Sequence, residues 1–149
     1  MSCDNIFWGN SSQSSVLFKM QKRVIRIIMG YGYRESCSEL FKELKILLLS
    51  SQYIFPILLF IVNNRDYFVK NSVYHNIYTR QRNNLHLPQV TLAMYQKEVY
   101  YSGIKIFNGL PMAIKDIFSK SEKFKVALKH FLLTHLFYTY DDFLTNCNI

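Results

Sequence analysis

The sequence predicts an all-α fold, a small irregular helical domain of about five to seven helices with a long ordered loop near residues 63–91. Apolar residues recur at helical spacing in several segments, and Ser, Gly and Pro stand at the segment ends. No segment shows the sustained alternation of a strand, and no repeat of 20 to 50 residues is visible. Because 149 residues are the size of one domain, we expect a single helical domain over residues 1–149.

Composition and charge narrow the class of protein. Half of the residues are hydrophobic and only 19% are charged, so the chain can form a packed core. A net charge of +8 favours an acidic partner, either nucleic acid or an anionic membrane surface. Three widely separated cysteines are typical of free thiols, and the first residues lack the basic lead and apolar run of a secretory signal. We therefore expect an intracellular location, cytoplasm or nucleus.

The first expected helix runs from about Ser14 to Met29 and is closed by Gly30. Its apolar stripe consists of Leu17, Met20, Val24, Ile27 and Ile28. The basic residues fall within an arc of about 100° opposite that stripe, and they are Lys19, Lys22, Arg23 and Arg26. We therefore expect one face in the core and a basic ridge on the other.

Two helices should follow. Ser36 and Glu39 have the spacing of a capping box, which predicts a short helix carrying Leu40, Phe41 and Leu44. Ser50 and Ser51 form a plausible second cap before the most apolar segment, Tyr53 to Val62. Pro56 interrupts that segment, and a proline inside a helix costs about 3 kcal/mol. We therefore expect a kink or a later start of this helix.

The region from Asn63 to Gln89 is polar, rich in Asn, and predicted to be a long ordered loop with at most a short helix around Asp66 to Val69. Loops of this length are uncommon in compact domains and are usually functional or linkers. Beyond it we expect a helix from Leu92 to Phe107, with Gly103 as its one breaker, ending before a turn at Asn108–Pro111.

The last helices complete the expected fold. Pro111 should open a short helix from Met112 to Phe118. A final clear helix begins after Ser121. Its apolar side should carry Phe124, Leu128, Phe131, Leu132 and His135, with Lys123, Lys125 and Lys129 toward solvent.

Two motifs stand out in the second half of the chain: T-R-Q-R-N-N-L-H-L-P at residues 79–88 and Y-Y-S-G-I-K-I-F-N-G-L-P at residues 100–111. With Trp8–Ser12, Ser36–Leu44 and Phe124–Leu133 they form five ordered motifs. This set, from about Phe7 to Leu144, resembles the C-terminal tail of the reverse transcriptases of jockey-like non-LTR retrotransposons. The resemblance implies a fragment of a larger polyprotein, an RNA-directed DNA polymerase whose catalytic residues lie upstream of this tail.

No catalytic, metal or cofactor site is predicted within the chain. Reverse transcriptases hold their metal ions with Tyr-x-Asp-Asp, but here the residue two before Asp141 is Thr139, and no third carboxylate lies on a predicted strand. We expect Asp141 and Asp142 to form a turn or a helix cap. The Cys and His residues lack metal-ligand spacing, and neither a Gly-x-Ser-x-Gly elbow nor a Gly-rich phosphate loop occurs. Cys37 is expected to pack as a small hydrophobe, and no small-molecule substrate is indicated.

Nucleic-acid binding is the remaining function that the residues of this chain could support. The basic ridge of the first helix is equally consistent with phosphate contacts and with a solvated face. For Arg82 we favour nucleic-acid binding, and for Arg80 a structural role in tying down the loop. The aromatic residues Tyr74, Tyr78, Tyr100 and Tyr101 can stack on bases, but aromatic residues in a small helical domain are more often part of the core.

Three functions follow from these observations. The first is a non-catalytic polymerase remnant that contacts template RNA or target DNA. The alternative is a structural module that docks on the polymerase core, at its thumb, through apolar residues including Leu17, Val24, Ile57, Leu58 and Phe60. A membrane segment at 46–62 is disfavoured, because a spanning helix needs about 20 largely apolar residues.

Overall fold

The computed structural model describes residues 13–75, 81–89 and 99–147, and these residues form an all-α fold, as predicted. The longer helices are α2 (Ser14–Met29), α4 (Leu49–Asn63), α7 (Val99–Gly109), α9 (Ser121–Thr134) and α10 (Tyr140–Cys147). Shorter ones are α3 (Ser38–Glu43), the 3₁₀ turn η1 (Arg65–Tyr67), α5 (Asn71–His75) and α8 (Met112–Lys115). Within the described ranges the sole β-type pairing is an isolated antiparallel bridge between Lys70 and Leu85.

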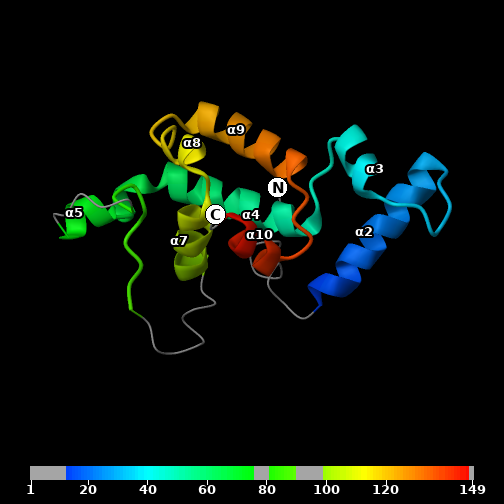
Figure 1. The fold of residues 1–149 in the computed structure, drawn as a ribbon, viewed down its shortest axis with the longest axis horizontal. Coiled ribbons are helices and arrows are strands. Elements are labelled where there is room, and N and C mark those ends of the chain that lie inside the picture. The colour runs from blue at the N-terminus through cyan, green and yellow to red at the C-terminus, as the bar shows by residue number, and fades with distance from the viewer. Residues whose placement is uncertain (1–12, 76–80, 90–98, 148–149) are drawn as a thin grey trace.

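Helix α4 is the centre of the fold. It contacts both α7 and α9, and α10 packs on α7, so that α9 and α7 lie on different sides of α4 in Figure 1. Its side chains Ile54, Ile57, Leu58 and Ile61 are fully buried or nearly so. Because burying each such side chain contributes about 1.5–3 kcal/mol, the apolar segment predicted from sequence is the main source of core stability.

Pro56 lies inside α4, which begins well before it at Leu49. The expected later start of this helix is therefore wrong. The cost of an internal proline, about 3 kcal/mol, is offset by the burial of apolar side chains both before and after it on the same helix.

The polar region after α4 contains more regular structure than expected. The short helix predicted around Asp66 is present as η1, and a second one, α5, was not predicted. Leu85 pairs with Lys70 in the antiparallel bridge, and the His86 amide donates to the Val69 carbonyl at 2.7 Å. The long loop is thus held by backbone hydrogen bonds to its own first half.

Helix α7 differs from its prediction at its C-terminal end. It continues through Asn108 and Gly109, which were expected to form a turn, while residues 90–98 lie outside the described ranges. Gly103 is a contact residue and not a breaker, because a Cβ atom there would lie 2.9 Å from Ile61 Cδ1. Its missing side chain lets α7 approach α4 closely.

The helices that follow agree better with expectation. Helix α8 is shorter than predicted, but Phe118 still packs into the core, 4.8 Å from Phe107 between ring centroids. Helix α9 begins at Ser121 and buries Phe124, Leu128 and Leu132, with Phe131 partly buried. The predicted inward side chain of His135 is exposed, whereas the lysines at 123, 125 and 129 face solvent as expected.

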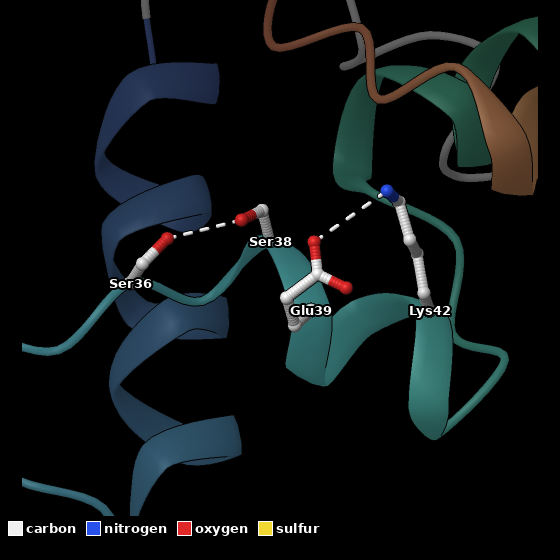
Figure 2. Close-up of polar contacts among 4 residues, drawn as sticks. All are labelled: Ser36, Ser38, Glu39 and Lys42. Atoms are coloured by element: carbon white, nitrogen blue, oxygen red, sulfur yellow. Dashed lines mark hydrogen bonds and ion pairs between the residues drawn. The ribbon is translucent and has the colours of Figure 1, made fainter.

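The expected capping box at Ser36 and Glu39 does not form. Figure 2 shows that the Ser36 hydroxyl bonds to the Ser38 hydroxyl at 3.0 Å, while the Glu39 carboxylate points to Lys42, 3.6 Å from its Nζ. Helix α3 begins at Ser38 with Cys37 as its N-cap residue, one position later than the box requires. Its first turn therefore lacks a side-chain cap.

A reciprocal cap of this kind occurs instead at the start of α10. The Thr139 amide donates to Asp142 Oδ2, and the Asp142 amide donates to Thr139 Oγ1, both at 3.0 Å. The acidic pair Asp141–Asp142 thus lies in the first turn of a helix, where negative charge is favourable. The cap predicted for this pair is therefore made by Asp142, and Asp141 lies beside it in the first turn.

Candidate interaction surface on helix α2

Helix α2 is attached to the rest of the protein by a narrow face. Ile25 is its one fully buried residue, and Phe18 stacks on Phe41 with 6.5 Å between ring centroids. Gln21 lies on the same face, where its Nε2 donates to the Leu47 carbonyl and its Oε1 accepts from the Leu49 amide. This side chain supplies a cap for the start of α4, so part of the docking of α2 is polar.

The apolar stripe predicted to face the core is exposed, and that prediction is wrong. Its five residues, together with Val16, have exposed fractions between 45% and 69%; they are Leu17, Met20, Val24, Ile27 and Ile28. At 100° per residue, the stripe lies about 120° around the helix from the face that carries Phe18, Gln21, Ile25 and Met29. Two apolar rows exist on this helix, and the fold buries the one that contains the aromatic ring. We call the exposed row the α2 apolar face.

The basic ridge of α2 divides into two kinds of residue. Lys22 and Arg26 are engaged within the protein: Lys22 Nζ lies 4.4 Å from the Phe18 ring centroid, and Arg26 Nε and Nη2 donate to the Glu35 carbonyl at 3.0 and 2.8 Å. Lys19 and Arg23 are exposed, and among the described residues neither has a hydrogen-bond or ion-pair partner. Of the four residues of the basic ridge, Arg26 is therefore committed to a carbonyl, while among the described residues the Lys22 ammonium contacts a ring but has no hydrogen-bond or ion-pair partner.

The structure does not bring the predicted loop arginines to this ridge. Arg80 lies outside the described ranges. Arg82 is exposed beside α5, where its carbonyl accepts from the Ser72 amide at 3.3 Å. Since α5 and α2 lie at opposite ends of the long axis in Figure 1, Arg82 and the α2 ridge do not form one binding surface.

The two motifs of the second half of the chain meet through side-chain amides. Asn108 Oδ1 accepts from the Leu85 amide at 2.8 Å, and Asn108 Nδ2 donates to the Leu85 carbonyl at 2.9 Å. Lys115 Nζ donates to Asn84 Oδ1 at 2.8 Å. We call these contacts the asparagine clamp. Leu85 is fully buried, so the clamp satisfies backbone groups that water cannot reach.

The aromatic residues considered for base stacking are largely occupied within the protein. Tyr74 stacks on His86 with 3.7 Å between centroids, and Tyr100 stacks on Phe68 at 5.1 Å. Tyr101 is half-buried, and Tyr78 lies outside the described residues. Of the apolar residues proposed for docking, Leu17, Val24 and Phe60 are exposed, whereas Ile57 and Leu58 belong to the core.

The ionisable groups show no arrangement of catalytic type in the described part of the chain. No three of its His, Cys, Asp or Glu residues gather as around a metal ion. Cys37 is buried in the α2–α3 cluster, as expected. Burial raises the pKa of Tyr53, and it raises the pKa of Tyr140 to about 12, with the nearby Tyr53 and Asp141 adding to the shift. These are effects of a low-polarity core on two phenols.

Comparisons of the chain with protein-family models, with curated proteins and with solved structures find no match. Among the helices in the described ranges, none is both long and apolar enough to cross a membrane.

Proposed function

We propose that this chain is a non-catalytic interaction module, corresponding to the C-terminal tail of a jockey-like reverse transcriptase, which docks on a protein surface through the α2 apolar face. The observation that carries the proposal is the exposure of six large apolar side chains in one row of a single helix. Soluble monomers rarely expose contiguous apolar patches beyond a few hundred Å², and larger ones mark interaction sites.

The spacing of the exposed residues fits recognition of a helix by a groove. Such grooves accept apolar anchors at positions i, i+3 or i+4, and i+7, and Leu17, Met20 and Val24 have this spacing. Ile27 and Ile28 extend the row by one more turn. A partner groove can therefore contact α2 over most of its length without disturbing the face that holds the helix to α3 and α4.

Charge indicates the kind of partner. Helix α2 carries four basic residues and no acidic ones, and Lys19 and Arg23 flank the apolar face. Antiparallel pairing of two copies would place this flank against itself, so that like charges oppose. A groove with an acidic rim is therefore the better partner, and under the family resemblance it would belong to the polymerase core of the same polyprotein.

The docking is tested by supplying a tagged polymerase core of a jockey-like reverse transcriptase and measuring capture of this chain. We expect Ile27→Asp to abolish capture, because a carboxylate would be buried without a partner. Val73→Asp is the matched control, since Val73 on α5 is as exposed as Ile27. Equal capture of both variants would refute docking through α2, and concentration-dependent self-association lost in Ile27→Asp would assign the face to a second copy instead.

The absence of catalysis is tested separately by primer extension. With template, primer, deoxynucleotides and Mg²⁺, the chain alone is expected to give no product. Measurable extension that persists after further purification would contradict the non-catalytic assignment.

A second candidate function, contact with RNA or DNA, is favoured by the exposed Lys19 and Arg23 on a chain of net charge +8. Two phosphate contacts to a single strand give a salt slope of about −1.4. Affinity for single-stranded oligonucleotides should then fall about tenfold between 50 and 300 mM salt. Binding that is unchanged over this range would exclude phosphate contacts.

A further inference from the structure

A cavity of about 360 Å³ lies where the starts of α2, α4 and α10 come together. Figure 1 shows the first turn of α2 approaching the red helix α10 and the adjacent end of α4. Its lining includes Phe18, Lys19, Lys22, Ser50, Tyr138 and Asp141. The volume lies within the range of ligand pockets, about 300–1,000 Å³. Two of the four residues of the predicted basic ridge therefore border a concave site and not an open helix face.

The wall of this cavity is aromatic. Tyr138 and Phe18 meet edge to face with 5.9 Å between ring centroids, and Tyr138 is 48% exposed. The edge contact with Phe18 holds the tyrosine ring, while its exposed area remains available to a flat ligand. Stacking of a base on such a ring contributes about 1–3 kcal/mol to binding.

The polar groups of the cavity are mostly cationic or hydroxylic. Lys19 and Lys22 line it together with Ser14 and Ser15 from the first turn of α2. The Ser50 hydroxyl donates a hydrogen bond to the Phe137 carbonyl, so its proton is not available to a ligand. Among the described residues of the lining, Asp141 carries the one acidic group, and it disfavours ligands that carry several negative charges at one phosphate.

We infer that this cavity binds one nucleotide unit of a single-stranded nucleic acid, with the base stacked on Tyr138 and the bridging phosphodiester at Lys19 and Lys22. A phosphodiester carries a single charge, which two lysines and one aspartate accommodate better than a terminal phosphate or a triphosphate. A paired base cannot reach the ring, so the site selects single strands. The inference deepens the second candidate function and does not depend on docking through the α2 apolar face.

The test is fluorescence anisotropy of labelled dT12 and rU12 with the full chain at 50 mM salt. Tyr138→Ala should weaken binding at least fivefold, the lower end of the stacking contribution, with an unchanged salt slope. Lys19→Ala should weaken binding and lower the salt slope by about 0.7. Tyr138→Phe, which keeps the ring, should bind as the wild type does, and it also reports whether the site tolerates substitution.

Matched controls separate the cavity from general attraction. Tyr67→Ala removes a tyrosine that is 77% exposed in η1, and Lys125→Ala removes an exposed charge on α9. Both should change affinity less than twofold. Suppose that binding is salt-sensitive, that Lys125→Ala and Lys19→Ala weaken it equally, and that Tyr138→Ala has no effect. This result would refute nucleotide binding in the cavity, although phosphate contacts elsewhere on the protein would still explain the binding.

Competition completes the test. Unlabelled dT12 should displace the probe, whereas duplex DNA of the same length and 10 mM inorganic phosphate should not. If phosphate displaces the probe as well as dT12 does, the cavity is a general anion site, and the proposal of nucleotide binding is refuted. Complete absence of binding at 50 mM salt would remove both this inference and the second candidate function, and would leave the docking proposal to its own capture experiment.

Discussion

Removal of the Asn108 side chain should destabilise the protein far more than its partly exposed position suggests. Asn108 on α7 pairs with both backbone polar groups of Leu85, which lies 23 residues earlier in the chain. In Asn108→Ala, the Leu85 amide and carbonyl lose these partners at a residue with no exposed surface. An unsatisfied buried polar group costs about 1–3 kcal/mol, so we expect a loss of about 2–4 kcal/mol in the free energy of unfolding.

The assay is urea unfolding at pH 7 followed by far-ultraviolet circular dichroism. Because ordinary domains have about 5–15 kcal/mol of stability, the expected loss should move the midpoint clearly. Asn108→Asp keeps the accepting oxygen and removes only the donor, so it should cost about half or more of the alanine variant's loss. Asn146→Ala, at an exposed site on α10, is the control and should change stability by less than about 0.5 kcal/mol.

A result in which Asn108→Ala and Asn146→Ala are equally stable would refute the asparagine clamp. It would mean that water or a local shift satisfies the Leu85 backbone at little cost. An intermediate outcome, with Asn108→Asp as stable as the wild type, would show that the bond to the Leu85 amide carries the whole effect and that the donor to its carbonyl contributes nothing.

Three further predictions concern other parts of the core and its caps. Gly103→Val should lower the free energy of unfolding by about 2–3 kcal/mol in the same assay, because its Cβ would meet Ile61 at 2.9 Å. Asp142→Ala should cost about 1 kcal/mol by removing the α10 cap, whereas Asp141→Ala should cost less than half of that; equal effects would contradict the cap. Burial raises the pKa of Tyr140 to about 12, so the folded state holds this proton more tightly than the unfolded chain, whose tyrosines have a pKa near 10. The resulting stabilisation is present below about pH 10 and lost as pH rises toward 12. In Tyr140→Phe this contribution is absent. Allowing for solvent screening of the half-buried ring, the free energy of unfolding of the variant should fall by about 1 kcal/mol less than that of the wild type between pH 10 and pH 12.

Prediction from sequence succeeded where a segment's own composition decides its structure. The apolar run from Tyr53 to Val62 could only be stable when buried, and α4 is the centre of the core. Helix α9 begins at Ser121 and buries Phe124, Leu128 and Leu132 of its predicted apolar row, although His135 of that row is exposed. In these segments local helical periodicity and the hydrophobic effect favour the same answer.

The capping predictions show where local rules are insufficient. Ser36 and Glu39 have the spacing of a capping box, but α3 begins one residue later than that box requires, and Glu39 pairs with Lys42. Thr139 and Asp142 form the reciprocal cap in a segment where a turn or a cap was predicted, but the helix that follows it, α10, was not. A cap of this kind contributes about 1 kcal/mol, which is small enough for the packing of neighbouring segments to move the start of a helix by one residue.

The candidate surface is the part that sequence alone misplaced. Both apolar rows of α2 are readable in the sequence, and the longer one was assigned to the core. Which row is buried depends on contacts with the neighbouring elements. Phe18 stacks on Phe41, and Gln21 Oε1 accepts a hydrogen bond from the Leu49 amide at the start of α4. These contacts join different helices, so they cannot be predicted from the periodicity of α2 itself.

Three features could be read from single segments: that this chain is helical, that its core is built on the segment around Ile57, and that α2 has separate apolar and basic faces. Each of these follows from side chains on one segment and their spacing. Three others became visible only in the folded chain: the longer apolar row of α2 faces outward, Asn108 joins two distant motifs, and Lys19 borders a cavity with Tyr138. Burial and hydrogen bonding depend on pairs of segments. The pattern of one segment shows its apolar and polar faces, but it does not show which other segment packs against each face.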